Sequence, residues 1–125
     1  MADILQSLSI SSSGMTAQAS RLRHVSENIA NADTPGYRRK SLAFHEIANG
    51  GVESGRTNLS QAALPEIHDP AHPLAGENGT YQGANVDVIV EMADAREASR
   101  SYEANLKLFD QARQMSQGLL DLLRR

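Results

Sequence analysis

The chain has 125 residues, a length typical of one domain, so we predict a single domain over residues 1–125. The formal net charge of −3 and the pI of about 5.7 argue against general nucleic-acid binding. The absence of cysteines excludes disulfides and thiolate metal sites, and no apolar run approaches the ~20 residues that span a bilayer. The first residues lack the basic and apolar segments of a secretory signal, so we expect no cleaved signal peptide.

Residues 3–32 show the apolar spacing of a helix. The apolar stripe repeats every seven residues and consists of Leu8, Met15, Leu22 and Ile29. This stripe is narrow, and Gly14 weakens the helix by ~1 kcal/mol relative to alanine. Such a helix depends on partners that cover its stripe, so we expect it to pair with other helices.

The segment Asn28–Tyr37 ends this first helix. Asn31 and Asp33 favour caps and turns over helix interiors. Pro35 and Gly36 suit the central pair of a type II turn, because proline fixes φ and glycine accepts a positive φ. We therefore predict a helix stop followed by a tight turn.

Residues 38–84 show no helical periodicity. Six of the nine glycines and three of the four prolines lie here, which predicts an irregular, moderately mobile region. Segments 41–44 and 64–68 alternate in polarity and are candidates for one or two short β pieces. We interpret the basic run 38–40 as a solvated charged segment, because the chain is acidic and the run has no interleaved aromatics. The region is too long for an ordinary loop, which favours a functional role or ordering by contact with something else.

Residues 86–124 form the second and longer helical pattern. Asn85 or Asp87 is the expected N-cap, and Glu91 lies favourably in the opening turns. The apolar seam begins with Met92, Tyr102, Leu106 and Phe109. It then broadens to cover more than one face between residues 106 and 123. One short N-terminal helix cannot bury this surplus, which implies neighbouring subunits or a membrane surface.

No residue pattern in the chain points to catalysis. His68 and His72 form the only cluster that resembles metal ligands, but no third strong ligand lies nearby, so we interpret it as a solvated turn. No nucleophile and base can be placed together, so we predict a protein without enzymatic activity, cofactor or metal. Asn28 and Asn105 lie inside the helical patterns, where each is either solvated or fixes helix register.

Three runs of residues resemble those of a known protein family. Asn28–Tyr37 is similar to the N-terminal motif of bacterial flagellar rod and hook proteins, and Asn85–Met92 and Ala98–Asn105 are similar to their C-terminal motif. Both motifs occur in the expected order, over roughly residues 3–45 and 79–125. The short chain leaves no room for the added domains of longer members, so within the family it is most similar to the proximal-rod proteins.

This resemblance implies a non-enzymatic structural subunit of the flagellar basal-body rod. Members of the family leave the cell unfolded through the flagellar type III export apparatus and polymerise into the rod, which crosses the periplasm and transmits torque. The implied fold is mainly α, with two long terminal helices paired as an antiparallel, coiled-coil-like hairpin and an irregular middle region with minor β structure. The implied partners are further copies of the chain, other rod subunits and, in transit, the export apparatus, without nucleic-acid binding or membrane insertion.

On this basis we assign an assembly interface to the helix seams and to the residues of the two motifs. The assigned residues are Leu8, Met15, Leu22, Asn28, Ile29, Asn31, Pro35, Gly36, Tyr37, Asn85, Asp87, Glu91, Met92, Arg100, Tyr102, Asn105, Leu106, Phe109, Met115 and Leu119. Two alternatives stay open: a different rod subunit of the same family, and a peripheral membrane protein that uses its amphipathic C-terminal helix. A metal-dependent enzyme built on His68 and His72 is the weakest alternative.

Overall fold

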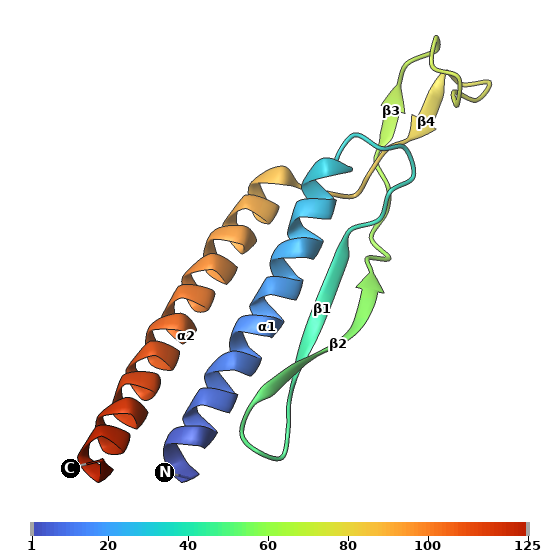
Figure 1. Ribbon diagram of the computed structural model, residues 1–125. Helices are drawn as coiled ribbons and strands as arrows, with labels where there is room; N and C mark the ends of the chain where they lie inside the picture. Colours follow the sequence, from blue (N-terminus) through green and yellow to red (C-terminus); the bar gives the residue numbers. More distant parts are fainter. Residues whose placement is uncertain (1, 125) are drawn as a thin grey trace.

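The computed structural model describes residues 2–124 and consists of two long helices and two β-hairpins. The elements in chain order are α1 (Ala2–Ala30), β1 (Lys40–Glu46), β2 (Val52–Leu59), β3 (Glu66–His68), β4 (Thr80–Gln82) and α2 (Val88–Leu123). The helices pack side by side and run in opposite directions, and the β1–β2 hairpin lies along α1 (Figure 1). The predicted mainly α architecture with paired terminal helices is confirmed.

The ends of both helices follow from local side-chain chemistry. Helix α1 stops at Ala30, two residues before the predicted end, where the Asn31 side-chain amide donates to the Glu27 carbonyl oxygen at 2.8 Å. The following turn has a positive φ of 74° at Gly36 and a hydrogen bond from the Tyr37 amide to the Thr34 carbonyl, which confirms the type II turn. Asp87 caps α2 by accepting a hydrogen bond from the Ile89 amide at 3.0 Å, so it is the N-cap of the two candidates.

The seam between α1 and α2 consists of small and polar side chains. On α2, the seam positions repeat every seven residues at Glu91, Ala98, Asn105 and Ala112, and all but Asn105 are buried. On α1, Gly14 lies against Asn105 so closely that an added Cβ would be 2.7 Å from the Asn105 side-chain nitrogen. Glycine and alanine therefore let the two helices approach closely, with little large apolar surface between them.

The large apolar residues of the two predicted seams lie only partly between α1 and α2. Met92, Leu106 and Ile29 are exposed, with 56%, 41% and 37% of their surface accessible. Met15 and Tyr102 are half-buried and line one hollow at the flank of the seam. The large apolar groups lie beside the contact line because the small residues at seven-residue spacing occupy it.

The β1–β2 hairpin is longer and more regular than the sequence indicated. The strands pair antiparallel from Lys40 opposite Leu59 to Glu46 opposite Val52, with one irregularity between Leu42 and Phe44. Its partner surface is α1: the His24 imidazole nitrogen lies 2.9 Å from the Thr57 hydroxyl oxygen. The region therefore contains more strand structure than the one or two short β segments that we expected.

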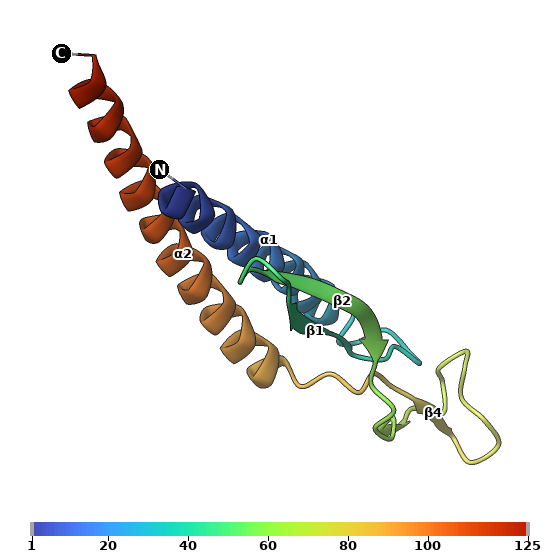
Figure 2. The same cartoon turned by 90° about the horizontal axis from the view of Figure 1, so that it is seen from below.

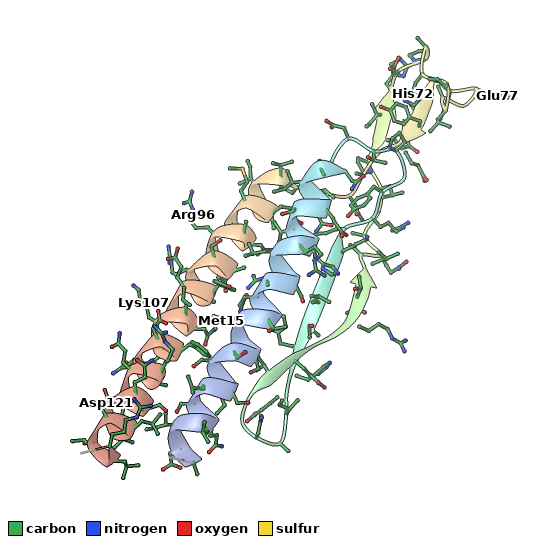
Figure 3. The ribbon with its side chains drawn as sticks, viewed as in Figure 1. Met15, His72, Glu77, Arg96, Lys107 and Asp121 are labelled. Carbon is green, nitrogen blue, oxygen red and sulfur yellow. The ribbon has the colours of Figure 1, made fainter. Side chains whose placement is uncertain are left out.

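The β3–β4 hairpin forms an arm that extends beyond the helices (Figure 1). Its strands pair from Glu66 opposite Gln82 to His68 opposite Thr80. The His72 ring stacks on the Tyr81 ring with 3.9 Å between centroids, which packs the distal loop against the strands. His72 and Glu77 both lie in this distal loop (Figure 3).

Helix α2 continues past the part of α1 that covers it. At 1.5 Å per residue, its 36 residues span about 54 Å, against about 44 Å for the 29 residues of α1. The last turns of α2 run on beyond the start of α1 (Figure 2). The end of α2 therefore has little intrachain cover.

Candidate functional site

Asn28 is the centre of a buried hydrogen-bond network where α1, β1 and α2 meet. Its side-chain nitrogen donates to the Lys40 carbonyl oxygen at 2.9 Å and to a carboxylate oxygen of Glu91 at 3.2 Å. Its side-chain oxygen accepts from the Tyr37 hydroxyl at 2.8 Å and from the Lys40 amide at 2.9 Å. Asn28 and Glu91 have no accessible surface, and every polar atom of the Asn28 amide is satisfied. We call Asn28, Tyr37, Arg39, Lys40 and Glu91 the clasp.

Arg39 joins the clasp to two carboxylates of α2. Glu91 and Asp94 are three residues apart and therefore lie on the same face of the helix. The Arg39 guanidinium donates to Glu91, and also to Asp94 at 2.7 Å. Burial opposes the charge on Arg39, but the hydrogen bonds and attraction of Glu91 and Asp94 outweigh it and raise the pKa of the guanidinium. The buried Glu91 charge is therefore compensated within the chain.

Asn85 attaches the β region to the start of α2. Its side-chain oxygen accepts from the Arg39 amide at 2.7 Å, and its side-chain nitrogen donates to the Ala62 carbonyl at 3.1 Å. The Asn85 amide also donates to the Tyr37 carbonyl at 3.2 Å. One residue thus holds together three segments that are far apart in the sequence.

The basic run 38–40 is part of this network, so its interpretation as a solvated charged segment is wrong. Arg38 donates to the carbonyl oxygens of Ser60 and Ala62 at 2.9 and 3.1 Å. Lys40 pairs with Glu27 at 2.8 Å, and this hydrogen bond lowers the pKa of the Glu27 carboxyl and raises the pKa of the Lys40 amine. Lys40 therefore connects the start of β1 to the end of α1, and Arg38 connects the segment before β1 to the segment after β2.

Comparisons with known proteins match both motif-bearing ends of the chain. The family described as flagella basal body rod protein matches residues 8–38, and the family described as flagellar basal body rod FlgEFG protein C-terminal matches residues 77–122. The chain is 42% identical to the flagellar basal-body rod protein FlgC of Agrobacterium fabrum, over 92% of this chain and 91% of that protein. The chain belongs to the FlgC family.

Other FlgC proteins are also similar to this chain over most of its length. FlgC of Salmonella typhimurium is 35% identical over 90% of this chain and 92% of its own length. FlgC of Aquifex aeolicus is 36% identical over 87% of this chain and 89% of its own length. The chain is thus a structural subunit of the flagellar basal-body rod and is non-enzymatic, as predicted. Neither α1 nor α2 carries an apolar stretch long enough to cross a membrane.

In this FlgC-family chain, the residues assigned to assembly fall into three groups. The motif residues Asn28, Tyr37, Asn85 and Glu91 lie together in the intrachain network, with Asn31, Pro35, Gly36 and Asp87 in the adjoining turn and cap. The half-buried positions are Asn105 in the seam and, beside it, Leu8, Met15, Leu22, Tyr102 and Phe109. The exposed positions are Ile29, Met92, Arg100, Leu106, Met115 and Leu119. Their assignment to contacts between FlgC subunits stays a prediction.

Five residues of this network were not among the predicted site residues: Glu27, Arg38, Arg39, Lys40 and Asp94. The spacing of Glu91 and Asp94 places two carboxylates on one helix face, and this arrangement favours a cationic partner such as Arg39. Nothing local in the sequence links those carboxylates to a cation more than fifty residues earlier. This pairing depends on the return path of the chain through both hairpins.

His68 and His72 do not come together with a third ligand. Within the described range 2–124, no group of three His, Asp or Glu side chains is placed to hold a metal ion. The His72 ring stacks on Tyr81, and its Nδ1 accepts from the Leu74 amide at 3.1 Å. His72 therefore packs the distal loop of the arm against Tyr81.

Raising the pH is expected to weaken the clasp through Tyr37. Burial raises the pKa of the Tyr37 hydroxyl above its ordinary value of 10.0, so the folded state favours the protonated form that donates to Asn28. The contribution is fully present below pH 10.0 and is lost as the pH rises through the folded pKa. Denaturant unfolding at pH 8 and pH 11 should show a larger loss of stability for the wild type than for Tyr37→Phe. At pH 8, Tyr37→Phe itself should cost about 1 kcal/mol. Equal losses in both proteins would contradict this role.

Proposed function

We propose that this rod subunit polymerises through its terminal helices, and that the resulting rod crosses the periplasm and transmits torque. Further copies and other rod subunits would cover the apolar surface of α2 that lacks an intrachain partner. Residues 1–125 would act as one rod domain, with the clasp fixing how the hairpin regions meet the helices. The subunit would reach the rod unfolded, through the flagellar type III export apparatus.

The observation that carries the proposal is an exposed apolar stripe on the second half of α2. Leu108, Met115, Leu119 and Leu122 follow one another at steps of seven, four and three residues, so they share one helix face. Their accessible fractions are 55%, 55%, 38% and 63%. The opposite face of α2 is polar, and Arg96 and Lys107 project from the side away from α1 (Figure 3). A stripe of this kind on one face favours a contact surface over general exposure.

A hollow beside the stripe also supports a contact between subunits at this place. It has a volume of about 310 Å³ and lies between the first half of α1 and the second half of α2. Its lining includes Ile10, Leu108 and Met115. An apolar side chain from a neighbouring subunit could fill this hollow and remove more of the stripe from water.

The character of the core supports export in an unfolded state. The buried apolar residues are Ala17, Val25, Ala84, Ala98 and Ala112, and the largest fully buried side chains are Glu91 and Asn28. Such a core buries little apolar surface, so the free energy of unfolding of a single subunit should be small. A subunit of this kind unfolds readily in transit and gains stability from its neighbours in the rod.

The proposed function is tested by deleting the gene that encodes the chain and imaging the isolated basal bodies. We expect incomplete rods in the deletion strain, restoration by the wild-type chain, and the chain itself in restored basal bodies. Complete rods without the chain would contradict the proposal. Flotation with liposomes in place of basal-body incorporation would favour the peripheral membrane alternative.

The dilute monomer is expected to be ordered at the clasp and poorly ordered at the end of α2. The clasp residues are held by buried hydrogen bonds, whereas residues 115–123 of α2 are almost entirely exposed. Hydrogen–deuterium exchange of the monomer should therefore be fast in 115–123 and slow around Asn28 and Glu91. Uniformly slow exchange along α2 would contradict the dependence of this end on neighbours.

A further inference from the structure

The seven-residue repeat along the seam does not by itself define how α1 and α2 are aligned. Ala98 and Ala112 are both buried on α2, one at seven residues to either side of Asn105. A shift of one helix along the other by seven residues, about 10 Å, would bring an alanine back into the seam at either of these places. The alignment must therefore be specified by residues that depart from the alanine repeat.

Asn105 interrupts the two alanines and packs against Gly14. A Cβ added at Gly14 would lie 2.7, 2.9 and 3.0 Å from the side-chain nitrogen, Cγ and side-chain oxygen of Asn105. The Asn105 side-chain nitrogen donates to the Ser101 carbonyl oxygen at 3.1 Å, which holds the amide in this place. Glycine weakens a helix interior, but here it leaves the space that the Asn105 amide occupies.

The Gly14–Asn105 contact has the same alignment as the clasp. Gly14 precedes Asn28 by fourteen residues, and Asn105 follows Glu91 by fourteen residues. The contact and the Asn28–Glu91 hydrogen bond therefore belong to one antiparallel register and lie about 21 Å apart along it. Two separate points of the helix pair thus require the same alignment.

We propose that Gly14 and Asn105 form a register lock, which specifies the alignment of α1 and α2 within the subunit. By the spacing above, Arg21 is level with Ala98. A shift that brings Ala112 level with Gly14 would bring Asn105 level with Arg21, whose long side chain leaves no such space. A polar asparagine in a helix seam specifies register in this way, because it fits one alignment better than the others. The inference concerns the fold of one subunit and goes beyond the proposed function.

The alignment also decides which side chains meet in the hollow of about 310 Å³ between the two helices. Ile10 of α1 and Leu108 and Met115 of α2 share its lining. After a shift of seven residues, Ile10 would lie beside a different turn of α2, and Glu91 would no longer reach Asn28. A subunit in a shifted alignment would therefore lose the clasp and present a different surface.

A double-mutant cycle tests whether Gly14 and Asn105 fit each other. Gly14→Ala should lower the equilibrium constant of folding about fivefold, because overpacking of the contact outweighs the better helix propensity of alanine. In the Asn105→Ala background, the same substitution should raise this constant about fivefold, because the added Cβ no longer meets the amide. Denaturant unfolding followed by circular dichroism measures each constant.

Gly118→Ala is the matched control for Gly14→Ala. A Cβ added at Gly118 would meet no neighbouring side chain of residues 2–124 within 4 Å. Gly118→Ala should therefore raise the folding constant in both backgrounds. A stabilising effect of Gly14→Ala in the wild-type chain, like that of Gly118→Ala, would overturn the inference.

Disulfide trapping tests the alignment itself, because the chain has no cysteine of its own. Ser11 and Ala112 are buried and line the same hollow, so Ser11→Cys/Ala112→Cys reports the native alignment. Leu119 lies seven residues further along α2, so Ser11→Cys/Leu119→Cys reports a shifted alignment. In dilute full-length monomer with oxidised glutathione, Asn105→Ala should speed formation of the shifted disulfide about tenfold and leave the native disulfide unchanged.

The double variant Gly14→Ala/Asn105→Ala separates alignment from stability. It should be more stable than Asn105→Ala, yet form the shifted disulfide as fast, because no asparagine then distinguishes the register. Equal rates of the shifted disulfide in the wild-type and Asn105→Ala chains would overturn the register lock. The proposed function is tested separately, by the presence of the wild-type chain in basal bodies.

Discussion

Replacing Leu119 by aspartate is expected to abolish rod assembly while leaving export intact. Leu119 is part of the exposed stripe on α2, and 38% of its surface is accessible in the isolated subunit. A carboxylate there would be buried without a partner at a contact between subunits, which costs several kcal/mol at each of many repeated contacts. Electron microscopy of basal bodies should show no complete rods, and immunoblots should still detect the exported chain. Leu106→Asp should act in the same way, because Leu106 is also exposed and apolar.

Gln114→Asp is the matched control for Leu119→Asp. Gln114 is exposed on α2 and lies seven residues after Lys107, on the outward face of the helix. The new residue and its helix propensity are the same in both variants, so they differ in the position of the charge and in the side chain that aspartate replaces. Rods should form normally with Gln114→Asp. Normal rods with Leu119→Asp would show that the stripe is not an assembly surface.

Replacing Arg39 by alanine is expected to destabilise the folded subunit by about 3 kcal/mol. Glu91 has no accessible surface, and the Arg39 guanidinium compensates its charge, so the substitution leaves a buried carboxylate with one amide donor. We place the value at the lower end of the usual range because 30% of the Arg39 side chain is accessible to water. Denaturant unfolding followed by circular dichroism measures the loss.

Two further variants separate charge compensation from simple loss of packing. Arg39→Ala/Glu91→Gln should be more stable than Arg39→Ala alone, because the neutral amide needs no cation. Arg38→Ala removes only hydrogen bonds to the carbonyl oxygens of Ser60 and Ala62, so it should cost about 1 kcal/mol. Equal stability of Arg39→Ala and Arg38→Ala would show that Arg39 does not compensate the buried charge of Glu91.

The parts of the fold that were predictable are those set by neighbouring residues. Pro35 and Gly36 specify their turn through their own backbone preferences, and Asp87 caps α2 through a bond to a residue two positions on. The two helices were predictable for the same reason, because their periodicity is local. These signals need no knowledge of the rest of the chain.

The seam and the clasp were not predictable in this way. Apolar periodicity predicts a seam of large side chains, but the contact line between the helices is made of Gly14, Ala98, Asn105 and Ala112. The buried Asn28–Glu91 pair joins residues 63 positions apart. Burying these two polar side chains costs free energy, which is offset only when Tyr37, Arg39 and Lys40 form hydrogen bonds with them in the folded chain. Strand β2 was missed because Val52–Leu59 has little apolar alternation of its own and depends on β1 and α1 for pairing.

The exposed stripe of α2 is expected to be buried between subunits in the rod. This burial can be tested in an electron cryo-microscopy map of the basal-body rod, at a resolution that shows side chains. We expect Leu108, Met115, Leu119 and Leu122 to lie against neighbouring helices, with the clasp unchanged inside each subunit. A map in which these four side chains face solvent would contradict assembly through α2.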